Sequence, residues 1–138
     1  FLLVRGTLKL IDFGISKAIQ SNETTNVIRE NQVGTVNYMA PEALTGPHDS
    51  TTSGQLKIGR PSDVWSLGCI LYEMVYGVPP FGSFNVIQRI QKIIDSSYNI
   101  SYPPIQNEHL LQCIKGCLER DQSKRLTIDD LLSHSFVA

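Results

Sequence analysis

Three residues that follow a short apolar run, Asp12, Phe13 and Gly14, could do chemistry on phosphate groups. A carboxylate at the end of a strand can reach a Mg²⁺ ion that bridges phosphate oxygens. Gly14 lets the backbone move between arrangements, and Phe13 can pack beneath the carboxylate. The triplet alone is weak evidence, because an ordinary strand-to-loop turn with a solvated aspartate would contain the same residues.

Two downstream motifs give this triplet its weight. Ala-Pro-Glu stands at 40–42 and Ser-Asp-Val-Trp-Ser-Leu-Gly at 62–68, with a polar segment before the first of them. This order is typical of the lower part of a protein kinase. The whole chain resembles eukaryotic protein kinases and, more narrowly, the monopolar-spindle (TTK-type) checkpoint kinases, especially fungal members. The sharpest part of that narrower resemblance is Val-Gly-Thr-Val-Asn-Tyr-Met at 33–39.

The resemblance implies a set of nucleotide-binding residues. Asp12 would ligate Mg²⁺, and Phe13 would join the stack of side chains that assembles in the active state. Leu2 would pack under the adenine ring of ATP, and Ile11 would line the back of the nucleotide pocket. ATP and Mg²⁺ are therefore the expected cofactors.

The same resemblance gives roles to the polar segment. Thr35 would face the substrate residue after the phosphoacceptor and would bond the catalytic aspartate, which is not in this chain. Ile15 resembles kinases that prefer threonine acceptors. Ser21, Thr24, Thr25 and Thr35 are candidate phosphorylation sites, since a phosphate adds about −1.5 to −2 charges and can order a loop by pairing with arginine. The alternative is that polar loops contain hydroxyl groups in any case.

Three further residues have structural roles by resemblance. Glu42 and Arg125 would form a buried ion pair that ties the polar segment to the last helices; the alternative is two unrelated surface charges. The family usually has proline where this chain has Gln122, so the turn before Arg125 departs from the pattern. Asp63 would cap the central helix and hold backbone groups of the catalytic loop, which this chain lacks.

Composition limits the function classes. The chain has 138 residues, a net charge of −1 and 41% hydrophobic residues, which fits one globular domain. With no excess of either charge, neither nucleic acid nor a membrane is an expected partner. Phe1 opens an apolar run too short for a signal peptide, so we expect a piece of a longer protein. Cys69, Cys113 and Cys117 are expected to be small buried side chains in a reducing, intracellular compartment.

The pattern of elements predicts a mainly α fold with a short β-hairpin, the C-terminal lobe of a protein kinase without its N-lobe and catalytic loop. Arg5 and Gly6 separate two apolar runs and predict the hairpin turn. Helices are expected from Ser62, as N-cap, to about 76, over 84–94, over 108–118, and from Thr127, which begins a capping box. The expected divisions are the hairpin at 1–11, the activation segment at 12–42, a variable loop at 43–61 and the helical lobe at 62–138.

Apolar residues predict how three of these helices pack, and in the third they form a core-facing stripe of Leu110, Ile114, Cys117 and Leu118. The first is apolar on all sides, so we expect it to lie buried at the centre of the domain; by resemblance, its Ile70 and Met74 would support the stack beneath the adenine. In the second, Ile87, Ile90 and Ile94 are expected on one face.

Two functions are open at this point. The first is an active serine/threonine or dual-specificity kinase acting on protein substrates in spindle-checkpoint signalling. By resemblance it would act in the nucleus or cytoplasm, with kinetochore or spindle proteins as partners. The second is a pseudokinase or docking module without catalysis. Intact Asp12, Gly14, Thr35 and Glu42 favour the first, although the chain alone is expected to be inactive.

Overall fold

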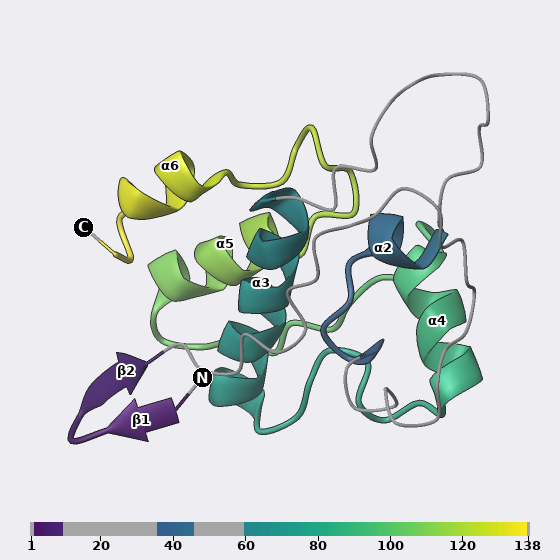
Figure 1. Cartoon of the computed structure of the whole chain (residues 1–138), viewed down its shortest axis with the longest axis horizontal. Coiled ribbons are helices and arrows are strands. Elements are labelled where there is room, and N and C mark those ends of the chain that lie inside the picture. Colours follow the sequence, from purple (N-terminus) through teal and green to yellow (C-terminus); the bar gives the residue numbers. More distant parts are fainter. Residues whose placement is uncertain (1, 10–35, 46–59, 138) are drawn as a thin grey trace, which may run out of the picture.

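The computed structural model describes residues 2–9, 36–45 and 60–137. These residues form one two-stranded sheet and a group of helices, as the predicted C-lobe fold requires (Figure 1). The elements are β1 (Leu2–Val4), β2 (Thr7–Lys9), α2 (Pro41–Thr45), α3 (Arg60–Tyr76), α4 (Val86–Ile94), α5 (Glu108–Cys117) and α6 (Ile128–Leu132). Helix α2 was not predicted, and it runs across the expected division at 42–43.

The predicted hairpin is present. Strands β1 and β2 pair antiparallel, with Leu2 opposite Lys9 and Val4 opposite Thr7. The two turn residues both have positive φ, 50° at Arg5 and 78° at Gly6. Two-residue hairpin loops of type I′ need this conformation at both positions, because its twist matches that of the strands.

The central helix α3 begins earlier than expected. It starts at Arg60 with Pro61 in its first turn, where a missing N–H costs nothing because no intrahelical acceptor is available. Ser62 is therefore not the N-cap, and that prediction was wrong. Its hydroxyl instead donates to Glu42 Oε1 at 3.0 Å. The predicted end is right, since Gly77 follows the helix with φ 80°.

Helix α3 is buried along one side. Helix α5 crosses it closely (Figure 1), and a Cβ added to Gly68 would lie 2.5 Å from the Cβ of Cys117. The expectation that α3 is buried all round was wrong, because Met74 is 73% exposed. The buried residues of α3 instead follow the spacing of one broad helical face: Ser62, Val64, Trp65, Gly68, Cys69 and Tyr72.

The remaining helices are close to the predicted ranges. Asn85 caps α4 with a capping box, so the helix starts two residues later than expected. The buried residue of α4 is Ile93, whereas Ile87 is 71% exposed, so the predicted face was wrong by part of a turn. Thr127 begins α6 with the predicted capping box.

All three cysteines are free and buried, as expected. Among the described helices, none has both the length and the apolar character that crossing a bilayer requires.

Candidate functional site

The segment 36–45 is fixed to the helical lobe by a group of polar side chains. We call this group the anchor site and define it by Tyr38, Glu42, Ser66, Glu73 and Arg125. Apolar side chains of the same segment are also buried, since Val36 and Ala40 are each only 1% exposed. Both belong to the main core cluster, which is centred on Trp65, Phe81 and Ile114.

At one end of the anchor site, Glu42 of α2 meets Arg125 of the turn before α6. Arg125 Nη1 lies 2.6 Å from Glu42 Oε1, and Nη2 lies 3.1 Å from Oε2. The two groups thus meet as a fork, the strongest arrangement for arginine and carboxylate. The side chain of Arg125 is fully buried, and that of Glu42 is 17% exposed.

The buried guanidinium of Arg125 has further partners besides Glu42. Its Nε donates to Glu119 O at 2.7 Å, Nη1 to Pro61 O at 2.8 Å and Nη2 to Arg120 O at 3.3 Å. Its carbon lies 5.3 Å from the ring centre of Trp65. A buried cation is tolerated only when it is paired and hydrogen-bonded, and here all three nitrogens are bonded.

The same contacts set the charge state of Glu42. Burial works to raise the pKa of this carboxyl. The hydrogen bonds from Arg125, from its own backbone and from Ser62, together with the charge of Arg125, outweigh burial and lower the pKa below its ordinary value of 4.5. The folded state therefore holds Glu42 ionised.

At the other end of the anchor site, Tyr38 binds α3. Its hydroxyl donates to Glu73 Oε2 at 2.6 Å, and the hydroxyl of Ser66 donates to Tyr38 O at 2.8 Å. The hydrogen bond to the Glu73 carboxylate, followed by burial, raises the pKa of Tyr38 to about 12. The phenol therefore stays protonated and acts as the donor in its hydrogen bond to Glu73 Oε2.

Sequence reasoning did not find the contact between Tyr38 and Glu73. One signal was available, because Glu73 is the only charged residue in the second half of α3. A lone carboxylate in an apolar helix needs a partner.

The structure leaves many predicted site residues undescribed. Leu2 lies in β1, but its side chain is outside what is described. Asp63 is exposed in the first turn of α3, and Ile70 is half-buried. The other predicted positions lie outside the described residues: Ile11, Asp12, Phe13, Gly14, Ile15, Ser21, Thr24, Thr25 and Thr35.

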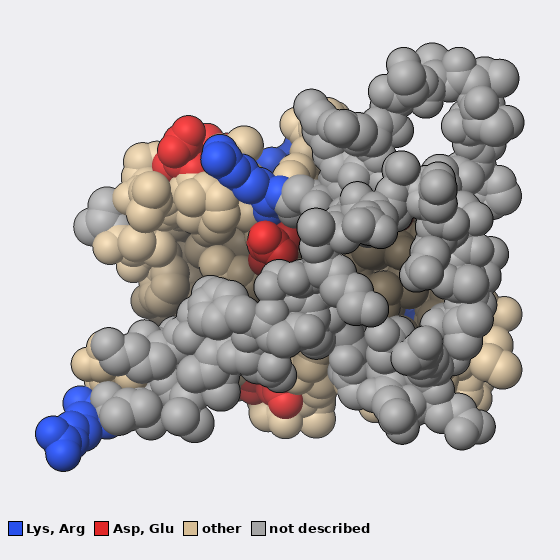
Figure 2. Space-filling view, in the orientation of Figure 1, with Lys and Arg blue, Asp and Glu red and all other residues tan. Residues whose placement is uncertain are grey.

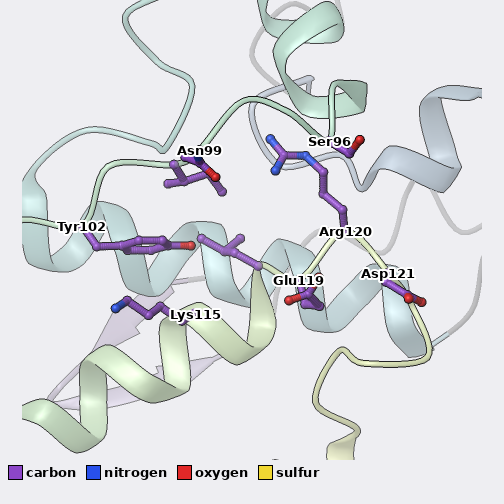
Figure 3. A pocket seen from close by; sticks show the side chains of 9 residues that line it. Ser96, Asn99, Tyr102, Lys115, Glu119, Arg120 and Asp121 are labelled. Carbon is purple, nitrogen blue, oxygen red and sulfur yellow. The ribbon is translucent and has the colours of Figure 1, made fainter.

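A polar cavity of about 550 Å³ opens beside the turn that carries Arg120 (Figure 3). Its wall mixes two cations, Lys115 and Arg120, with two acids, Glu119 and Asp121. Figure 2 likewise shows acidic and basic side chains in small groups over the described part of this face, without a broad patch of one sign. The described residues also contain no group of three or more His, Cys, Asp or Glu that could hold a metal ion.

Comparison with known proteins identifies relatives of this chain. The chain is 53% identical over 138 residues to "Probable serine/threonine-protein kinase mps1" of Dictyostelium discoideum. It is 51% identical to "Serine/threonine-protein kinase mph1" of Schizosaccharomyces pombe and 44% identical to "Dual specificity protein kinase TTK" of Mus musculus. In each case 99% of this chain is matched, but it spans only 14%, 23% and 16% of the respective relative.

The family model described as "Protein kinase domain" matches residues 1–137, nearly the full chain. The motif order, the helical lobe and the arginine–carboxylate junction agree with that match. The chain therefore belongs to the protein kinase domain family, and it is similar to kinases of the monopolar-spindle type.

Proposed function

We propose that the protein containing this chain is a serine/threonine or dual-specificity kinase of the monopolar-spindle type, which transfers the γ-phosphate of ATP to protein hydroxyls. The observation that carries this proposal is the anchor site. It holds the segment after Thr35 at two points: Tyr38 is bonded to Glu73 and Ser66 of α3, and Glu42 is bonded to Arg125 in the turn before α6. Phosphoryl transfer depends mainly on positioning, so a rigidly held acceptor-binding segment serves that reaction.

The nucleotide chemistry is assigned to residues outside the described ones. Asp12 has the type of side chain that binds Mg²⁺. Mg²⁺ is usually held by one or two carboxylates together with water and phosphate oxygens, so few protein ligands are needed. When bound, Mg²⁺ neutralises charge between the phosphates of ATP. We assign Phe13 and Gly14 to the support of that carboxylate, and Leu2 and Ile11 to the walls of the adenine pocket.

Thr35 is assigned to the substrate side of the site. Its neighbour Val36 is buried, and Tyr38 is bonded to Glu73 and Ser66, so the chain directly after Thr35 is anchored to the helical lobe. A hydroxyl at this position would hydrogen-bond the catalytic aspartate supplied by the rest of the protein. Of the candidate phosphorylation sites, we propose Thr24 or Thr25, which the resemblance to autophosphorylating checkpoint kinases favours.

The cellular role is proposed from the relatives. Their names include "mps1" and "TTK", and the sequence between 33 and 39 carries the same resemblance. We propose protein substrates in spindle-checkpoint signalling and a location at the kinetochore or spindle. The alternative, a pseudokinase or docking module, keeps the anchor site but has no use for Asp12.

The test is phosphate transfer from labelled ATP to a protein acceptor by the full-length protein. Asp12→Ala should reduce transfer to background because the metal loses its carboxylate ligand, while the circular dichroism spectrum stays unchanged. Asp129→Ala, which removes an exposed carboxylate from α6, is the matched control and should keep full activity. Near-normal transfer by Asp12→Ala would refute the metal-ligand role, and an inactive wild-type protein would favour the pseudokinase.

A further inference from the structure

The C-terminal end of α4 is held by an arginine from a distant turn. The last carbonyl groups of a helix have no partner within the helix and carry partial negative charge. Arg120 supplies donors to two of them, with Nε 2.8 Å from Ile93 O and Nη2 2.9 Å from Lys92 O. Helix α4 thus ends on a guanidinium that belongs to the turn after α5.

The charge of Arg120 is directed at this helix end. The turn also carries Glu119 and Asp121, yet Figure 3 shows the guanidinium extending away from both carboxylates, between Asn99 and Ser96. Among the described residues, the one ion pair is that of Arg125 with Glu42. Arg120 therefore acts on α4 as a charged cap rather than as the partner of a neighbouring acid.

Helix α4 in turn touches the segment that carries the anchor site. Helices α2 and α4 are in direct contact. Ile93 of α4 is fully buried in the same core cluster as Val36 and Ala40, and Ile90 packs against that cluster. A shift of α4 along its axis would therefore move the packing surface beneath residues 36–45.

We propose that Arg120 is a positioning residue for the acceptor-binding segment. It fixes the end of α4, and α4 packs against α2 and shares a core cluster with Val36 and Ala40 of the segment 36–45. Resting on the proposed kinase function, this predicts that Arg120 controls the affinity for the protein acceptor without contacting ATP or the reacting atoms. Its effect then separates KM for the acceptor from kcat.

The first arm of the test is steady-state kinetics of the full-length protein with casein as acceptor. Arg120→Lys keeps the charge but not the pair of fixed donors, and Arg120→Gln removes the charge as well. We expect KM for casein to rise by about tenfold in Arg120→Gln, the effect of one lost charge-assisted hydrogen bond, and by less in Arg120→Lys. KM for ATP and kcat should stay near wild type. Lys124→Gln, an exposed cation in the same turn, is the control.

The second arm is hydrogen–deuterium exchange, which does not depend on activity. The two Arg120 variants should exchange faster over 86–95 and also over 36–45, while α5 is unchanged. Wild-type exchange over 36–45, or a uniform increase across the lobe with loss of kcat alone, would overturn the proposal. If the wild-type protein transfers no phosphate, the proposed function fails, and exchange over 36–45 alone decides whether Arg120 positions the segment.

Discussion

The two ends of the anchor site hold one segment by different physical means. At Glu42 a carboxylate meets a fully buried guanidinium that is also bonded to three backbone carbonyls. At Tyr38 a neutral phenol donates to a carboxylate in a half-buried setting. At the Glu42 end, loss of either Glu42 or Arg125 leaves the other charge buried without its partner. At the Tyr38 end, the hydroxyl can be lost while the aromatic ring keeps its packing. The difference indicates a fixed end at α2 and a more adjustable end next to Thr35.

The largest effect is expected at the fixed end. Arg125→Ala should lower the free energy of unfolding by about 3–5 kcal/mol, because three carbonyls and Glu42 lose their donor. Glu42→Ala should cost a similar amount by leaving the buried guanidinium of Arg125 without a counter-charge. Denaturant unfolding of the purified protein measures both. A loss below 1 kcal/mol, typical of a surface ion pair, would contradict the buried-pair assignment.

A smaller effect is expected at the adjustable end. Tyr38→Phe removes the hydroxyl but keeps the ring, so it should lower the free energy of unfolding by about 1.5–3 kcal/mol, the range for hydrogen bonds to charged groups. Tyr76→Phe is a matched control, since its hydroxyl donates to a neutral backbone oxygen, Pro103 O, and should cost less. Equal losses in both variants would show that the Glu73 carboxylate adds nothing.

The smallest effect is a pH dependence that distinguishes the two ends. The pKa of Glu42 is lower in the folded chain than in the unfolded chain, so acid protonates the unfolded chain first. The stability that Glu42 contributes is present above about pH 4.5 and is lost as the pH falls through its folded pKa. Denaturant unfolding at a series of pH values measures this loss. In Glu42→Gln, the free energy of unfolding should fall less on acidification than in the wild type. Among the described residues, the exposed Asp95, Asp121 and Asp130 also have lowered pKa values, so they contribute to the acid loss that remains. An unchanged acid profile in Glu42→Gln would exclude this link.

Local sequence chemistry predicted the features that depend on a few neighbouring residues. The hairpin follows from Arg5 and Gly6, the end of α3 from Gly77, and the start of α6 from the Thr127 capping box. Each of these is decided within one turn of chain, so no knowledge of the tertiary structure was needed.

Features that depend on tertiary contacts were not predicted from local chemistry. The buried face of α4 is set by what packs against Ile93, not by the spacing of its isoleucines. Ser62 is bonded to Glu42 rather than capping α3, because a distant carboxylate lies within reach. The pairing of Glu42 with Arg125 was expected only through resemblance, since no local pattern joins residues so far apart in the chain.

Glu42 and Arg125 act as one unit that fixes the segment 36–45 to the helical lobe. A double-mutant cycle of Glu42→Ala and Arg125→Ala, measured as the free energy of unfolding, tests this coupling. The double variant should lose clearly less than the sum of the two single losses, because either single change already breaks the contact between Glu42 and Arg125. Losses that simply add would show that the two side chains stabilise the fold independently, and would contradict the claim.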